Sequence, residues 1–276
     1  MSRFHRFAMV VFLLGLCARA GLAAVADEPI SATFDAKGVK IHYLHQGKGE
    51  PVVLIHGLHS SAEMNWRMPG VMAALARDHM VIALDLPGHG QSDKPDKEDA
   101  YGLQMVEDVA LLMDHLKVEK AHIVGYSMGG IVAVKFMVMH PERTLSGLDG
   151  GMGWLREGGM LQRVWARMPA QEGSRTPAVC IRSIGKLAVT ADEIKGIKAP
   201  VEVVIGDRDP VKRLYVAPLQ PVRKDWPVVE IKDAGHMDCI MKKEFRDAVT
   251  DWVAKQKPKP PEAPKPEPPA VAPKQG

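Results

Sequence analysis

A serine framed by glycines is the feature of this sequence that points most directly to chemistry. Residues 125–129 read Gly-Tyr-Ser-Met-Gly, so Ser127 has a glycine two positions before it and another two positions after it. An apolar run at 121–125 precedes the motif, and a run with helical spacing at 128–140 follows it. This pattern predicts a tight turn between a buried strand and a helix, with the serine hydroxyl held out of the sheet in a strained backbone conformation.

A serine at such a turn could attack a carbonyl carbon. The amides and the dipole at the start of the following helix would lie beside the negative oxygen that develops in the reaction. The backbone N–H of Met128 is therefore one predicted oxyanion donor. The loop in the sequence Leu-Ile-His-Gly-Leu-His-Ser-Ser supplies the other, because Gly57 permits a turn there and the N–H of Leu58 would point inward.

A serine hydroxyl is a poor nucleophile without a base, and His236 is the best candidate among the 11 histidines. It follows the last predicted strand, whereas the other histidines lie in the first residues of the chain, within predicted strands, near helix ends or in other loops. His59 is one of these loop residues and could contact a substrate.

The imidazole of such a base needs an acid to orient it and to stabilise its charged form. Asp209 is favoured because it follows the strongly apolar strand predicted at 201–206. The resulting chain order of serine, aspartate and histidine is one of the known orders for such triads. Asp207 in the same loop is the first alternative, and Asp149, at the end of the preceding predicted strand, is the second.

The segments around these residues alternate between strand and helix patterns. Strands are predicted at 39–44, 51–56, 80–85, 121–125, 144–149, 201–206 and 227–232, and helices at 70–78, 103–116, 128–140 and 242–256. Repeated strand–helix units predict an α/β fold, in which a mostly parallel sheet has helices on both faces.

The alternation breaks between about residues 151 and 196, where a Met-, Gly- and Arg-rich stretch predicts a small cap insertion. We call this stretch the cap segment. It contains Trp154 and Trp165, which we expect to line a substrate pocket together with His59 and Met237.

The start of the chain predicts export. Residues 1–26 combine early arginines, an apolar stretch and an Ala-Val-Ala motif, which is typical of a cleaved signal peptide for the periplasm or for secretion. Leu16 is a poor residue before a lipidated Cys17, so a lipid-anchored form is disfavoured. After cleavage we expect no stable membrane insertion.

The end of the chain predicts a disordered tail, because residues 256–276 are rich in Pro, Lys and Glu and have no apolar periodicity. Residues 27–255 are left as one domain. The chain has 36 Lys+Arg and 33 Asp+Glu, and the signal segment holds three arginines and no acid before residue 27. The near-neutral mature charge argues against nucleic acid as a partner.

No cofactor is predicted, and no metal-ligand spacing surrounds the cysteines. Cys180 and Cys239 could pair in an oxidising compartment or could remain two buried thiols.

Together these motifs resemble the α/β-hydrolase family of the fold-1 type, over roughly residues 30–255. The resemblance rests on His56-Gly57, the loop 85–92, the turn around Ser127, Gly206 with Asp209, and Gly235-His236. It implies the fold and a serine nucleophile but leaves the substrate open, and we expect a small-molecule acyl substrate. Serine at position 127 argues against dehalogenases and epoxide hydrolases, which have aspartate there.

The leading hypothesis is hydrolysis of a carboxylic ester, lactone or thioester through an acyl-enzyme. The same triad could instead serve carbon–carbon bond hydrolysis or a lyase reaction. A non-catalytic binding protein on this fold is a third possibility, because a fold does not fix a function. The complete set of triad candidates argues against the third possibility. The oligomeric state cannot be predicted.

Overall fold

The computed structural model of this chain describes residues 28–169 and 176–256. The predicted signal segment 1–26 and the predicted tail 256–276, apart from its first residue, therefore lie outside the described residues. Within the described ranges, no helix is both long enough and apolar enough to cross a bilayer.

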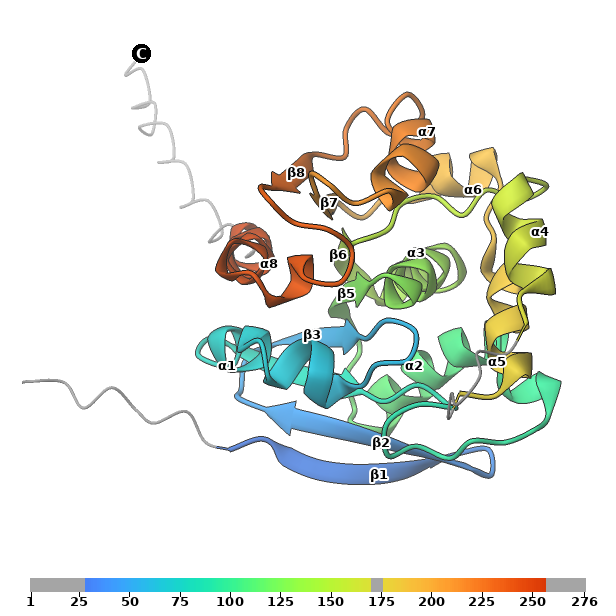
Figure 1. Cartoon of the computed structure of the whole chain (residues 1–276). Helices are drawn as coiled ribbons and strands as arrows, with labels where there is room; N and C mark the ends of the chain where they lie inside the picture. Colours follow the sequence, from blue (N-terminus) through green and yellow to red (C-terminus); the bar gives the residue numbers. More distant parts are fainter. Residues whose placement is uncertain (1–27, 170–175, 257–276) are drawn as a thin grey trace, which may run out of the picture.

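A sheet of eight strands forms the centre of the described structure (Figure 1). The strands are β1 (Ile30–Ala36), β2 (Val39–Gln46), β3 (Glu50–Ile55), β4 (His79–Leu84), β5 (Ala121–Tyr126), β6 (Thr144–Gly150), β7 (Val201–Gly206) and β8 (Val228–Ile231). They follow the order β1-β2-β4-β3-β5-β6-β7-β8 across the sheet. Strand β2 is antiparallel to its neighbours β1 and β4, and all the other neighbouring pairs are parallel. The predicted mostly parallel α/β sheet is thus confirmed.

Helices cover both faces of the sheet. The α-helices are α1 (Val71–Leu75), α2 (Leu103–His115), α3 (Met128–Met139), α4 (Met160–Arg167), α5 (Ala178–Ser183), α6 (Ala191–Gly196), α7 (Ala217–Leu219) and α8 (Lys243–Lys255). Short 3-10 or π turns are η1 (Glu63–Arg67), η2 (Glu98–Ala100), η3 (Pro141–Arg143), η4 (Ile184–Leu187), η5 (Lys212–Val216) and η6 (Cys239–Met241). Figure 1 shows α1 and α8 on one side of the sheet and α2 and α3 on the other.

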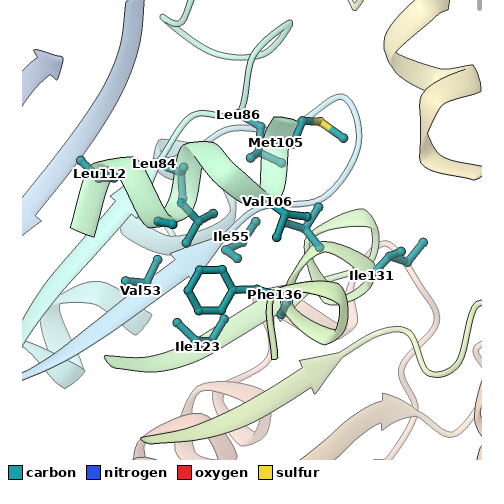
Figure 2. Packing of buried hydrophobic residues seen from close by; sticks show 14 of the residues in the cluster. Val53, Ile55, Leu84, Leu86, Met105, Val106, Leu112, Ile123, Ile131 and Phe136 are labelled. Atoms are coloured by element: carbon teal, nitrogen blue, oxygen red, sulfur yellow. The ribbon is translucent and has the colours of Figure 1, made fainter. Parts of the chain in front are cut away.

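The sheet divides the apolar core, because successive strand residues point to opposite faces. Val53 and Ile55 pack in the cluster with α2 and α3, whereas Val52 and Leu54 pack in the cluster with α1 and α8. Figure 2 shows the first cluster, to which Phe136 of α3 contributes. Each fully buried side chain of this size stabilises the fold by about 1.5–3 kcal/mol. This packing holds β5 and α3, and therefore the turn between them, in place.

Strand β1 is not predicted by the sequence. It pairs only with β2, at the edge of the sheet, and only Phe34 and Ala36 among its residues are buried. An edge strand with so little buried surface has a weak apolar pattern, which explains why the sequence does not reveal it.

The cap segment lies between β6 and β7 and contains α4, α5, η4 and α6, with residues 170–175 outside the described part. On α4, Leu161 and Trp165 pack against the core cluster of α2 and α3. The side chains of Met160 and Val164 on the same helix are 65% and 45% exposed. Figure 1 shows α4 and α5 standing beside α3, so the cap segment covers the α3 side of the molecule.

Cys180 and Cys239 carry free thiols and form no disulfide. Cys180 packs in the core cluster of α2 and α3, whereas Cys239 packs in the cluster of α1 and α8. The sheet separates these clusters, so the pairing considered from the sequence is wrong and both cysteines are buried thiols.

Candidate active site

Ser127 occupies the turn between β5 and α3 with φ 56° and ψ −118°. A positive φ is strained for a residue with a side chain. The neighbouring glycines allow this turn to exist. A Cβ atom on Gly125 would lie 2.0 Å from the carbonyl oxygen of Gly129, and a Cβ atom on Gly129 would lie 2.0 Å from the carbonyl oxygen of Ile55. Only glycine fits at both positions, so the motif in the sequence reflects close approach of backbone to backbone.

A continuous chain of hydrogen bonds joins Ser127, His236 and Asp209. Ser127 Oγ lies 2.8 Å from His236 Nε2, and His236 Nδ1 lies 2.7 Å from Asp209 Oδ2. A carboxylate only accepts hydrogen bonds, so Nδ1 carries the proton and Nε2 is left to accept from the serine hydroxyl. The Asp209 side chain is fully buried, whereas 26% of the His236 side chain is exposed. The Asp209 carboxylate is thus enclosed by the protein, and the His236 imidazole is partly open to solvent.

Asp209 is fixed by a second contact, because its Oδ1 accepts a hydrogen bond from the backbone N–H of Val211 at 2.8 Å. Asp207, the first alternative for the acid, instead accepts from the backbone N–H of Ala234 at 3.2 Å. It therefore braces the loop that leads to His236 and does not contact the imidazole.

Asp149, the second alternative, lies away from the imidazole. Its side chain is directed toward α3, where a Cβ atom on Gly130 would lie 2.3 Å from its Oδ1. It is fully buried, and neither carboxyl oxygen has a hydrogen-bond partner among the described residues. Burial raises the pKa of Asp149 well above its usual range. Burial therefore favours the neutral form of this carboxyl, which lies outside the hydrogen-bonded chain.

The two predicted oxyanion donors flank the serine. Met128 is the first residue of α3, and Leu58 lies in the loop after β3. That loop approaches Ser127 closely, because a Cβ atom on Gly57 would lie 3.3 Å from Ser127 Cβ. The backbone N–H groups of Leu58 and Met128 donate to no other described residue. Both are free to bind an oxygen atom in the site.

The loop after β3 is held by a side chain that the sequence did not single out. The Oδ1 of Asn65, in η1, accepts a hydrogen bond from the backbone N–H of Gly57 at 2.8 Å. His56 braces the same loop from beneath: its Nδ1 donates to the Gly57 carbonyl at 2.7 Å, and its Nε2 accepts from the N–H of Leu86 at 3.0 Å. Burial lowers the pKa of His56, which keeps this imidazole neutral and able to do both.

Asp85 is a buried hub that joins this loop to its neighbours. It accepts hydrogen bonds from His42 Nδ1 at 2.8 Å and from the backbone N–H groups of Ala62 at 2.7 Å and Gln91 at 2.8 Å. Burial alone would raise the pKa of Asp85, but the hydrogen bonds from His42 and Gln91 help to lower it to about 2. The carboxylate therefore stays charged and holds the loops at the carboxyl ends of β3 and β4 together.

The expected pocket residues His59 and Met237 lie on loops at the same end of the sheet. His59 has a positive φ of 59°, and its Nδ1 lies 3.3 Å from the Oγ1 of Thr176, where the described cap segment resumes. Burial lowers the pKa of His59. Met237 follows His236 directly, and 85% of its side chain is exposed.

The two cap tryptophans differ in environment. Trp165 is half-buried on α4, and its Nε1–H donates to the hydroxyl of Tyr215 at 3.0 Å. Trp154 is buried in the core near α6, and its Nε1–H donates to the carbonyl oxygen of Val189 at 2.9 Å. Trp154 thus packs into the core and also borders a hollow lined by Arg156 and Thr190, and its role in a substrate pocket stays a prediction.

Tyr126 is a second residue whose contact the sequence did not reveal. Its hydroxyl donates to the backbone carbonyl of His236 at 2.6 Å. The two residues are 110 positions apart, and the only signal was the position of Tyr126 beside Ser127 in the glycine-framed motif. Among the described residues, no group of three or more His, Cys, Asp or Glu side chains could hold a metal ion.

Sequence comparison finds relatives for the central part of the chain. Residues 50–147 match a family model described as alpha/beta hydrolase fold. The chain is 35% identical over 142 residues to 2-hydroxymuconate semialdehyde hydrolase of Pseudomonas sp. strain CF600, which covers 49% of this chain and 48% of that protein. It is 42% identical over 113 residues to the dihydrolipoyllysine-residue acetyltransferase component of the acetoin cleaving system of Cupriavidus necator, covering 41% of this chain and 29% of that protein. The chain thus spans less than half the length of these curated relatives.

Solved structures extend the likeness to most of the chain. A meta-cleavage product hydrolase, CumD, has 25% sequence identity and a TM-score of 0.65, covering 82% of this chain and 98% of its own. A structure from work on carboxylesterases of Nitrososphaera gargenis has 17% identity and a TM-score of 0.65, with the same coverage, and shows the shared fold alone. The chain therefore has the alpha/beta hydrolase fold, which it shares with these solved hydrolases and, over residues 50–147, with the family model.

Proposed function

We propose that this protein is a serine hydrolase that cleaves a carboxylic ester, lactone or thioester through an acyl-enzyme. Ser127 would be the nucleophile, His236 the base and Asp209 the acid that orients it. The observation that carries the proposal is the chain of hydrogen bonds from Ser127 Oγ through His236 to Asp209, at 2.8 and 2.7 Å. A half-buried serine whose hydroxyl is hydrogen-bonded to an imidazole, itself hydrogen-bonded to a buried carboxylate, is the arrangement that activates serine toward a carbonyl carbon.

The reaction follows from these positions. As Ser127 Oγ attacks the carbonyl carbon, His236 Nε2 takes the hydroxyl proton, and the carbonyl oxygen becomes an oxyanion. The free N–H groups of Leu58 and Met128 would donate to that oxygen. The imidazolium, stabilised by Asp209, then protonates the leaving alcohol or thiol as its bond to the acyl carbon breaks. Water, deprotonated by His236, attacks the acyl-enzyme, and the acid product leaves with Ser127 restored.

Carbon–carbon bond hydrolysis on the same triad is the second candidate. It is supported by the likeness to 2-hydroxymuconate semialdehyde hydrolase and to a meta-cleavage product hydrolase. The family match ends at residue 147, before the cap segment, so it includes the nucleophile turn but not the cap that would shape a substrate pocket. The match therefore supports a serine nucleophile more strongly than it supports any one substrate. We prefer ester hydrolysis because it requires fewer specific pocket contacts than carbon–carbon bond hydrolysis.

We also propose that the protein is exported to the periplasm or the medium, on the basis of the signal pattern in residues 1–26. N-terminal sequencing of the protein from cell fractions tests this. A mature chain starting near Asp27 in the periplasm or medium supports export, and an intact Met1 in the cytoplasm contradicts it.

The function is tested by a substrate series. Purified protein is assayed on p-nitrophenyl acetate, butyrate and octanoate and on a meta-cleavage dienoate, with Ser127→Ala as the matched control. We expect turnover of at least one ester by the wild type and none above background by Ser127→Ala. Turnover of the dienoate alone would favour carbon–carbon hydrolysis, and no turnover of either class would contradict the proposed ester chemistry.

A further inference from the structure

The phenol of Tyr126 joins the nucleophile turn to the loop that carries His236. Tyr126 ends β5 directly before Ser127, and its hydroxyl donates to the carbonyl oxygen of His236 at 2.6 Å. Its ring centroid lies 5.8 Å from that of the imidazole. We propose that Tyr126 is a positioning residue that sets the place of the base His236 relative to Ser127. This inference rests on the proposed serine-hydrolase function.

The ring of Tyr126 is held in a narrow slot. Only 4% of the residue is exposed, and Phe245 of α8 meets the ring edge-on, with centroids 5.4 Å apart and planes at 88°. Gly151 forms another wall, since a Cβ atom there would lie 2.8 Å from two ring carbons. Burial raises the pKa of the Tyr126 phenol, so the hydroxyl keeps its proton and remains a donor. The surrounding residues therefore hold the Tyr126 hydroxyl in one position.

His236 needs such support because it lies in the loop between β8 and η6, outside every helix and strand. The two residues before it are held by acidic side chains: the N–H of Ala234 donates to Asp207 at 3.2 Å, and the N–H of Gly235 donates to Asp238 at 2.8 Å. Tyr126 contacts the peptide carbonyl of His236 itself. It is therefore the contact that acts most directly on the backbone of the base.

Ser127 and His236 are consequently linked twice. One link is the Oγ to Nε2 hydrogen bond, and the other runs from the Ser127 backbone through its neighbour Tyr126 to the His236 carbonyl. The imidazole must first reach the serine proton and then the leaving group, so a small displacement of its backbone weakens both transfers. Displacements of about 1 Å can reduce a rate roughly 100-fold. Because the phenol does not contact the reacting atoms, its loss should affect turnover far more than substrate binding.

The test is Tyr126→Phe, which removes the hydroxyl and keeps the ring in its slot. We expect kcat on p-nitrophenyl acetate to fall roughly 10- to 100-fold with little change in KM. The rate at which a fluorophosphonate labels Ser127 should fall by a similar factor, because labelling also depends on the base. Tyr101→Phe is the matched control: Tyr101 is also buried, and its hydroxyl donates to the carbonyl of Pro95 at 2.7 Å. It should lower Tm about as much and leave kcat and the labelling rate unchanged.

Each result has a distinct meaning. If Tyr126→Phe keeps the wild-type kcat and labelling rate while Ser127→Ala is inactive, the positioning role is wrong and the proposed function stands. Equal losses of kcat in the Tyr126 and Tyr101 variants would show general destabilisation and would also overturn the role. A wild type that neither hydrolyses esters nor is labelled at Ser127 rejects the proposed function, and the role of Tyr126 is then rejected with it.

Discussion

Gly129 and Ile55 are in backbone contact beneath the nucleophile turn: a Cβ atom on Gly129 would lie 2.0 Å from the carbonyl oxygen of Ile55. This contact joins the first turn of α3 to the end of β3, where the loop carrying Leu58 begins. The place of the nucleophile and the place of the oxyanion loop are therefore set by one point of contact, and no side chain can be added there without moving both.

We expect Gly129→Ala to abolish ester hydrolysis and to lower Tm by several degrees, because the backbone must shift to relieve the clash. Gly196→Ala is the matched control, since no heavy atom lies within 4 Å of a Cβ atom at that position. Thermal unfolding and kcat/KM for both variants are the measurements. A fully active Gly129→Ala would mean that the turn is less tightly packed than this contact indicates.

Asp209→Asn should reduce kcat about 10⁴-fold, because an amide at this position stabilises the wrong tautomer of the imidazole. Asp207→Asn should lose far less, since Asp207 only braces the backbone at Ala234. Steady-state kinetics of the two variants give the comparison. A larger loss of kcat in Asp207→Asn than in Asp209→Asn would show that Asp209 is not the acid.

Asp149 should make the free energy of unfolding depend on pH. Its pKa is raised in the folded protein, so above about pH 4 the unfolded chain ionises while the buried carboxyl stays neutral. The contribution of Asp149 to the free energy of unfolding is therefore greatest at low pH. It falls as pH rises toward the folded-state pKa, by up to about 1.4 kcal/mol per pH unit. Asp149→Asn cannot ionise, so its stability relative to the wild type should increase as pH rises above about 4.

Urea unfolding of the wild type and Asp149→Asn at several pH values measures this difference and cancels the other titrating groups. A difference that does not change with pH would mean that Asp149 keeps an ordinary pKa. Activity should survive the substitution, because Asp149 lies toward α3 and away from His236.

The sequence predicts those parts of the site that depend on a few neighbouring residues. The strand, turn and helix around Ser127 follow from local apolar spacing and two glycines, and Asp209 and His236 each follow a strong strand. Parallel strands bring their carboxyl ends to one edge of the sheet, so these residues meet there.

The contacts that the sequence did not reveal join residues that lie far apart along the chain. Nothing near Tyr126 indicates that its hydroxyl meets His236, 110 positions later. The apolar character of Trp154 does not indicate that its indole N–H donates to the carbonyl oxygen of Val189, 35 positions later. Strand β1 is hidden because an edge strand buries too few residues to leave a clear pattern.

Trp165→Ala should change the preferred acyl chain length. We expect kcat/KM of the wild type to rise with chain length and then stop, at about 0.8 kcal/mol per buried methylene, so that two methylenes that fit raise it roughly tenfold. Removing the indole should move the stopping point to longer chains. Tyr215→Phe, which loses only the hydrogen-bond partner of the indole, is the control. An unchanged profile in Trp165→Ala would place this side chain outside the acyl pocket.

A covalent acyl-enzyme on Ser127 can be detected by mass spectrometry of protein quenched during turnover of p-nitrophenyl acetate. We predict an acetyl group on the peptide that contains Ser127, formed in a burst of about one p-nitrophenol per active site if deacylation is slower than acylation. Asp209→Asn, whose acylation is slowed, should accumulate it far more slowly, and Ser127→Ala should not acquire it. Acetylation at another residue that accounts for turnover, or a Ser127→Ala variant that still turns over the ester, would contradict the account.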